Sequence, residues 1–136
     1  MASETKTAEN FIEKPKTLAA LRDEIAAGRT RAADLANEYY ERIAKKNQRL
    51  NIYLSLTKER ALAQAAHIDE MAAKGDPLPA IAGIPMGIKD VMVVQGAPST
   101  AGSKILKGYR PPYDCTAVAK LETAGALLLG KLNCDE

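Results

Sequence analysis

A single lysine, Lys89, stands inside an almost wholly apolar run that extends from residue 82 to residue 94. If residues 84–94 form a strand, side chains alternate between its two faces, so Lys89 points away from Ile88 and from Asp90. Asp90 is then a poor ion-pair partner for its own neighbour. Three interpretations stay open: the ammonium pairs with a carboxylate distant in sequence, it reaches the surface at the strand end, or it is desolvated and becomes a base of lowered pKa.

Other residue types that could do chemistry are sparse. Cys115 and Cys134 are too few and too far apart for a disulfide framework or a zinc site, so we expect two reduced thiols. His67 is the only histidine, and no cysteine or second histidine stands at ligand spacing. The sequence therefore predicts no metal site and no cofactor held by this chain.

The remaining polar residues near the apolar segments receive structural interpretations. Lys131 follows an apolar stretch and Gly130, and we expect it to be a solvated loop lysine. Asp90 is interpreted as a local hydrogen-bond acceptor and Asp114 as a helix N-cap. The hydroxyl-bearing residues of the intervening loop are interpreted as turn caps: Ser99, Thr100 and Ser103.

Composition and charge exclude several classes of protein. The 136 residues are 46% hydrophobic, which is enough for one domain with a core. The net charge is +2, from 19 basic and 17 acidic residues, so charge alone indicates no nucleic-acid footprint. The start of the chain has no signal-peptide core, and no apolar run approaches the roughly 20 residues of a membrane helix. We expect a cytoplasmic protein; an organellar matrix stays open, although no transit peptide is seen.

The elements that must position Lys89 follow from periodicity and caps. Thr17 and Thr30 are expected to cap the first two helices, and Gly75 to end the third. Residues 1–16 are expected to be a flexible lead-in, and residues 17–136 to belong to one domain. The expected helices cover residues 18–28, 30–47, 57–75 and 115–124, and the expected strands cover 50–56, 84–94 and 126–129.

This order of elements predicts an α/β fold. The strands at 84–94 and 126–129 are separated by a helical crossover, so they can pair in parallel. Two or three strands make a thin sheet, however, and strands this apolar usually have neighbours on both sides. We therefore expect an incomplete fold, the front of a longer domain.

Four segments in order resemble a known family. Residues 83–90, Gly-Ile-Pro-Met-Gly-Ile-Lys-Asp, resemble the lysine motif of the amidase signature enzymes. Residues 96–106 and 112–118 are similar to the loop and the helix start that follow that motif. Residues 125–136, Gly-Ala-Leu-Leu-Leu-Gly-Lys-Leu-Asn-Cys-Asp-Glu, are similar to the family's next strand and its Gly-Lys-x-Asn element. The resemblance implies N-terminal helices followed by the first strands of a mixed sheet flanked by helices.

The resemblance also implies a mechanism. The family uses a Ser–cis-Ser–Lys triad for acyl transfer, and Lys89 matches the triad lysine. A neutral Lys89 would take a proton from a bridging serine, which in turn activates the nucleophilic serine, and an apolar strand would keep the amine dry. Both catalytic serines are expected beyond Glu136, so the 136 residues alone are expected to be inactive.

Within the family, residues 103–106, 112–114 and 133–136 resemble one branch, the glutamine-hydrolysing components of tRNA-dependent amidotransferases. That branch implies glutamine as substrate, B and C subunits of the amidotransferase as partners, and Glu-tRNA(Gln) as the acceptor of ammonia. ATP and Mg²⁺ would be used by one of these partners. Two alternatives stay open: a solitary amidase acting on a small amide, and a non-catalytic interaction module.

Overall fold

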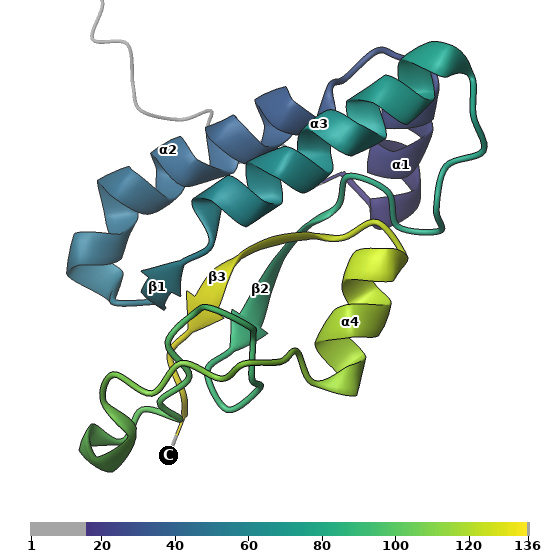
Figure 1. The fold of residues 1–136 in the computed structure, drawn as a ribbon. Coiled ribbons are helices and arrows are strands. Elements are labelled where there is room, and N and C mark those ends of the chain that lie inside the picture. Colours follow the sequence, from purple (N-terminus) through teal and green to yellow (C-terminus); the bar gives the residue numbers. More distant parts are fainter. Residues whose placement is uncertain (1–15, 136) are drawn as a thin grey trace, which may run out of the picture.

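The computed structural model describes residues 16–135, so the expected lead-in at 1–16 lies outside the described residues except for Lys16. The α-helices and strands follow one another along the described chain in the order that the sequence predicts (Figure 1). The elements, in order, are α1 (Leu18–Ala26), α2 (Ala32–Leu50), β1 (Tyr53–Leu56), α3 (Lys58–Lys74), β2 (Pro85–Lys89), the 3-10 helix η1 (Lys104–Leu106), α4 (Thr116–Thr123) and β3 (Leu127–Leu132).

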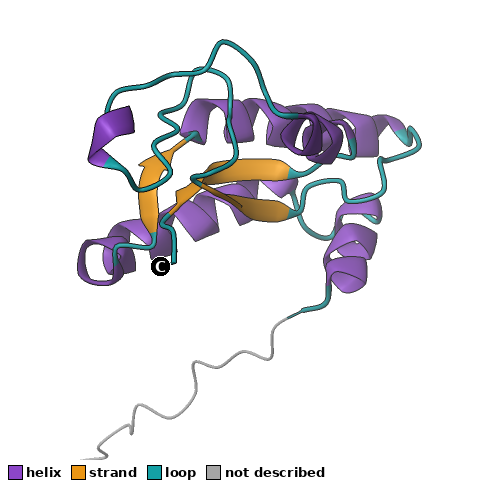
Figure 2. Cartoon of the chain, turned by 90° about the horizontal axis from the view of Figure 1, so that it is seen from below, coloured by secondary structure: helices purple, strands orange, loops and turns teal. Residues whose placement is uncertain are grey.

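The described strands form one mixed sheet in the order β1-β3-β2 (Figure 2). β3 lies in the middle, antiparallel to β1 and parallel to β2. The crossover through α4 therefore returns the chain beside β2, as the separation of two apolar segments by a helix predicts. The predicted α/β class and the parallel pair are confirmed.

Helices cover both faces of the sheet. α2 and α3 lie side by side along one face, and α4 lies on the other (Figure 1). The central strand shows why: Leu127 and Leu129 pack with the layer of α2 and α3, whereas Leu128 packs with Val118 of α4. All three leucines are buried, and burial of one such side chain contributes about 1.5–3 kcal/mol. This two-sided burial explains the continuous apolar run of β3.

Two glycines allow close approaches that a side chain would block. A Cβ atom at Gly130 would fall against the carbonyl oxygen of Ser55 and 3.0 Å from Leu56 Cα, so glycine lets β1 and β3 pair closely. Gly125 has φ +98°, and a Cβ there would lie 2.7 Å from Ala82 Cα. Glycine at 125 therefore lets the chain turn from α4 into β3 against the segment before β2.

The helix ends are partly as expected. Thr17 caps α1, its Oγ1 accepting from Ala20 N at 3.1 Å, and Gly75 ends α3 with φ +74°. The expected cap by Thr30 is wrong, because the N-cap position of α2 is Arg31, which makes no side-chain cap. The carboxylate of Asp69 on α3 accepts from the first two amides of α2 instead.

The strand boundaries also differ from the sequence expectations. β2 ends at Lys89, five residues before the expected end, because Met92 N donates to Lys89 O at 2.9 Å and turns the chain. β1 begins at Tyr53 rather than at residue 50. The expectation that Gly130 ends the last strand is wrong, because β3 continues through Lys131 to Leu132.

Candidate active site

Lys89 is the last residue of β2 and lies opposite Leu132 of β3. Its side chain is 45% exposed, and its Nζ donates to the carboxylate of Asp135. Two of the three interpretations left open for this ammonium are found among the described residues: it pairs with a carboxylate distant in sequence, and it reaches the surface at the strand end. The lysine therefore stands at a strand end, open to solvent on one side.

The expectation that the apolar run keeps Lys89 dry is wrong for the described chain. The hydrogen bond to Asp135 raises the pKa of Lys89, and burial opposes this only weakly. The same contact lowers the pKa of Asp135. Lys89 is charged in this arrangement, and a role as a base requires a change in its surroundings. The assignment of Lys89 as the triad lysine remains a prediction.

The buried lysine of this region is Lys131, which sequence reasoning placed in solvent. Lys131 is 0% exposed and Asp90 is 1% exposed. The Lys131 ammonium donates to Asp90 Oδ1 at 2.9 Å, to Ser99 Oγ at 2.9 Å and to the carbonyl oxygen of Pro98 at 3.3 Å. Three acceptors match its three N–H donors, so this buried cation is fully satisfied.

Asp90 is satisfied on its second oxygen as well. Asp90 Oδ2 accepts from Thr100 N at 3.0 Å and from Thr100 Oγ1 at 2.5 Å. Burial raises the pKa of the Asp90 carboxyl, but hydrogen bonds from Thr100 and Lys131 outweigh burial and hold it below its ordinary value. Asp90 is thus an acceptor, as expected, but the partners of its carboxylate come from two separate segments, the loop at Thr100 and strand β3 at Lys131.

A register shift explains how Lys131 reaches this position. Strict alternation along β3 would put Lys131 on the face of Leu127 and Leu129, beneath α2 and α3. Between Met86 and Gly87, however, the β3 partner changes from Leu128 to Gly130. The irregularity moves the following side chains to the opposite face, where the segment after β2 supplies acceptors. A single sequence does not reveal such a shift.

The loop hydroxyls divide between two roles. Ser103 Oγ accepts from Ile105 N at 3.3 Å and caps η1, which confirms the expected turn cap. Ser99 is 3% exposed and accepts from Lys131, so its role is in the buried network. Thr100 combines the roles: it accepts from Gly102 N at 3.2 Å and donates to Asp90.

A second charged cluster fixes α4 against α3. Arg60 donates to both oxygens of Asp114, at 3.1 and 2.6 Å, and to both oxygens of Glu122, at 2.7 and 2.6 Å. The interpretation of Asp114 as an N-cap is wrong, because the N-cap position of α4 is Cys115. The hydrogen bond from Arg60 holds the pKa of Asp114 below its usual value. The cluster anchors the crossover helix.

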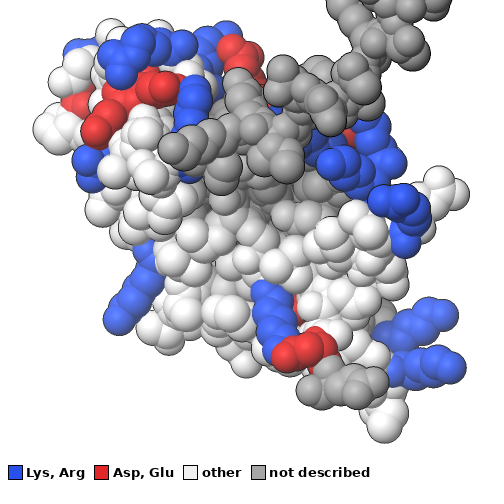
Figure 3. Space-filling view, turned by 180° about the vertical axis from the view of Figure 1, so that it is seen from behind, with Lys and Arg blue, Asp and Glu red and all other residues white. Residues whose placement is uncertain are grey.

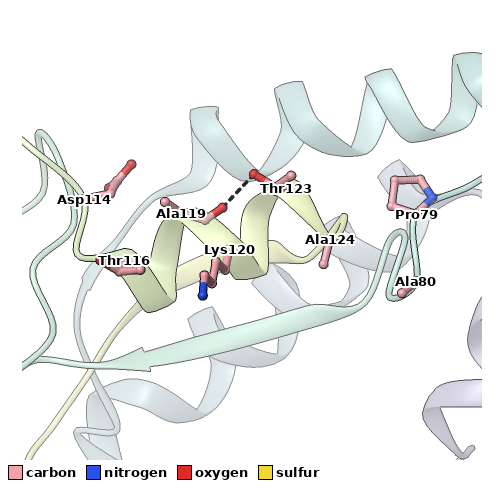
Figure 4. Close-up of a pocket in the computed structure, with 8 residues that line it drawn as sticks. All are labelled: Pro79, Ala80, Asp114, Thr116, Ala119, Lys120, Thr123 and Ala124. Atoms are coloured by element: carbon pink, nitrogen blue, oxygen red, sulfur yellow. Dashed lines mark hydrogen bonds between the residues drawn. The ribbon is translucent and has the colours of Figure 1, made fainter.

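A hollow beside α4 is separate from Lys89. It is an open hollow of about 640 Å³ along the outer side of α4. Figure 4 shows its lining residues, with Lys120 pointing away from the helix axis and Thr123 bonded to the carbonyl of Ala119. Neither Lys89 nor the buried pair lines it. The volume of this hollow therefore does not indicate where the candidate catalytic lysine lies.

The charged side chains on the surface and the side chains that could bind a metal limit which ligands the described part of the chain could bind. On the face in Figure 3, basic and acidic side chains lie next to one another in several places, with uncharged areas between these groups. Among residues 16–135, no three His, Cys, Asp or Glu side chains are grouped to hold a metal ion. Both cysteines are free thiols. Within the same range, none of the helices combines the length and apolarity needed to cross a bilayer.

Comparison with known proteins gives consistent matches. The family model described as Amidase matches residues 34–136. The A subunit of the glutamyl-tRNA(Gln) amidotransferase of Koribacter versatilis is 49% identical over 120 residues, which are 88% of this chain and 25% of that protein. Its counterpart in Acidobacterium capsulatum is 46% identical over 125 residues, which are 92% and 26% of the two chains. The chain spans about a quarter of the length of these curated relatives.

Solved structures share the fold. The native peptide amidase of Stenotrophomonas maltophilia matches with a TM-score of 0.83 and 32% identity, over 91% of this chain and 26% of that one. A chain from a vestigial protein complex, described as revealing the evolutionary origins of an s-triazine catabolic enzyme, matches with a TM-score of 0.84 and 38% identity. That match covers 89% of this chain and 27% of the other. The described helices and sheet are thus part of a larger fold in these proteins.

Proposed function

Because this chain belongs to the amidase family, we propose that it is the N-terminal part of the glutamine-hydrolysing A subunit of a tRNA-dependent amidotransferase. The observation that carries the proposal is the identity of 49% to a protein of that name over most of the chain. The order of helices, β2, crossover helix and β3 is compatible with it. The complete protein would act in the cytoplasm.

In the proposed reaction, Lys89 is the proton acceptor. Its neutral amine takes a proton from a bridging serine hydroxyl, which takes one from a nucleophilic serine. The nucleophile attacks the side-chain amide carbon of glutamine, the C–N bond breaks, and the proton is delivered to the departing nitrogen, which leaves as ammonia. Water then hydrolyses the acyl-enzyme to glutamate.

The geometry of Lys89 is compatible with this role on two counts. The residue ends a strand whose backbone is fixed by the central strand, so the starting point of its side chain is defined. Its side chain is 45% exposed, so a hydroxyl from a segment outside residues 16–135 can reach the amine. The contact with Asp135 holds the ammonium charged, so we propose that the serine hydroxyl replaces Asp135 in the working enzyme.

Partners complete the proposal. Ammonia from glutamine would pass to the B subunit, which activates Glu-tRNA(Gln) with ATP and Mg²⁺ and amidates it, and the C subunit would complete the assembly. The similarity of this chain to the structure of a peptide amidase favours a second candidate, a solitary amidase acting on a small amide. The two functions differ in one respect: only the first requires other proteins of a complex.

The test uses the complete gene co-expressed with its B and C subunits. We expect the three proteins to copurify, and the complex to convert Glu-tRNA(Gln) to Gln-tRNA(Gln) with glutamine as nitrogen donor. Hydrolysis of glutamine should require Lys89. A protein that does not bind these two partners but hydrolyses peptide or small amides would contradict the amidotransferase function and support the solitary amidase.

A further inference from the structure

The buried pair of Lys131 and Asp90 adjoins Lys89, but the proposed proton transfers do not use it. Both side chains are 1% exposed, so neither can contact a substrate that enters from solvent. The described groups that affect the charge of Lys89 are Asp135 and Cys134. Asp90 is not among them, although it is the next residue. The pair therefore has no direct route to the substrate and no evident electrostatic route to the amine.

What the pair does reach is the backbone on which Lys89 stands. Asp90 N donates to Leu132 O at 2.9 Å, and Asp90 O accepts from Ala101 N at 3.2 Å. The Asp90 carboxylate adds the bonds from Thr100 and Lys131. Asp90 is thus held through its amide, its carbonyl and both carboxylate oxygens.

Lys131 extends this attachment across the sheet. It lies opposite Ile88, the residue before Lys89, in the register of β2 and β3. Its ammonium joins Asp90 to the segment of Pro98 and Ser99. The central strand therefore fixes the chain on both sides of Lys89: it pairs with Ile88, and it holds Asp90 both by a backbone hydrogen bond from Asp90 N to Leu132 O and through the buried ammonium.

We propose that Lys131 and Asp90 are positioning residues for Lys89: the buried ion pair holds the end of β2 so that the amine meets the bridging serine at reacting distance. The proposal rests on the proposed function. Its physical basis is that proton transfer requires heavy atoms within hydrogen-bond reach, and that a displacement of about 1 Å costs up to about a hundredfold in rate. The side chain of Lys89 has several rotatable bonds, so a fixed backbone removes one source of such displacement.

Stability alone does not require an ion pair at this place. Removing one partner of a buried pair leaves an uncompensated charge and is strongly destabilising, whereas replacing both by well-packed hydrophobic residues of similar volume is often neutral or stabilising. Asparagine at position 90 removes the charge and keeps a side-chain oxygen that can accept from Thr100. A double substitution, Asp90→Asn with Lys131→Met, therefore separates the two roles. It restores stability relative to either single change, but it removes the ammonium that joins Asp90 to Pro98 and Ser99.

The experiment measures glutamine hydrolysis by the complete protein in complex with its partners. For D90N/K131M we expect kcat to fall about tenfold or more, with KM within about twofold of wild type, because neither residue contacts substrate. The melting temperature should stay close to that of wild type. The pH at which kcat/KM rises should stay unchanged, since the pair acts on position and not on the charge of the amine. Hydrogen exchange of the peptide covering residues 89–101 should accelerate.

A matched control is Arg60→Met, which removes the cation of a partly buried charged cluster, with Asp114 and Glu122, that is distant in sequence from Lys89. It should lower the melting temperature and leave kcat unchanged. If the double variant does not fold, Ser99→Ala removes one acceptor of Lys131 and should reduce kcat about two- to fivefold with the pH profile in place.

Two results would overturn the proposal while leaving the function intact. In the first, D90N/K131M has both the kcat and the melting temperature of wild type, so the pair is only structural. In the second, the pH profile moves by about one unit or more, so the pair acts through charge. A wild-type complex without amide hydrolysis is a different failure, because it refutes the proposed function and with it the positioning of a catalytic amine.

Discussion

Replacement of Arg60 by methionine tests how the crossover helix is anchored. The Arg60 side chain is 26% exposed and bonds two carboxylates, Asp114 just before α4 and Glu122 near its end. A fully exposed ion pair contributes about 0–1 kcal/mol, and a hydrogen bond to a buried charge about 1.5–3 kcal/mol. Arg60 lies between these limits, so we assign about 1 kcal/mol to each carboxylate and expect Arg60→Met to cost about 2 kcal/mol of unfolding free energy.

The pH dependence of this cost supplies its own check. Arg60 lowers the pKa of Asp114 in the folded state. The stabilisation is therefore fully present above the ordinary aspartate pKa and is lost as the pH falls through the lowered folded value. The difference between wild type and Arg60→Met should shrink below about pH 4.

The assay is urea denaturation of the complete protein at pH 7 and at pH 3, followed by circular dichroism. Arg60→Leu serves as a second apolar replacement. If both variants lose the same free energy of unfolding, the loss comes from removal of the guanidinium and not from the introduced methionine. A difference below about 0.5 kcal/mol at pH 7, or a difference of the same size at both pH values, would refute the reasoning.

Three further changes test contacts of β3 and the cap of α2, each by urea denaturation of the complete protein. Gly130→Ala should cost about 2–3 kcal/mol, because the added Cβ pushes against the backbone of β1, and a cost below about 1 kcal/mol would contradict this contact. Tyr40→Phe should cost only about 1 kcal/mol, since the Leu129 oxygen that accepts from Tyr40 at 2.9 Å keeps Thr57 N as a partner at 3.1 Å; a cost above about 3 kcal/mol would mean that the oxygen is left unpaired. Asp69→Ala should cost about 1–2 kcal/mol by uncapping α2, and no loss of stability would contradict the cap.

The helices were predictable because their signals are local. Thr17 marks the start of α1 by its own side chain, and Gly75 marks the end of α3 by its own backbone freedom. The structure places both residues as expected. The cap of α2 was not predictable from its flanking residues. Asp69, which supplies it, is more than thirty residues further along the chain, and only the packing of α2 on α3 brings it there.

The candidate site was predictable in part. The apolar run around Lys89 correctly indicated a strand that pairs in parallel with a later one, but it did not indicate where the strand ends. The sequence drew attention to one lysine in apolar surroundings and placed the other, Lys131, in solvent. A register shift and a partner distant in sequence bury Lys131. Asp90 and Lys131 carry opposite charges, and each lies beside an apolar segment. Pairing such residues in the sequence would have predicted this ion pair.

The central claim is that Lys89 is the proton acceptor of an amide-hydrolysing enzyme. The most direct test is the kcat for glutamine hydrolysis of Lys89→Met in the complete protein assembled with its partners, beside Lys74→Met as an exposed-lysine control. The account predicts that Lys89→Met lowers kcat by about 10²–10⁴-fold or more with little change in melting temperature, while Lys74→Met retains full activity. A Lys89→Met variant that hydrolyses glutamine within about tenfold of the wild-type rate would contradict the account.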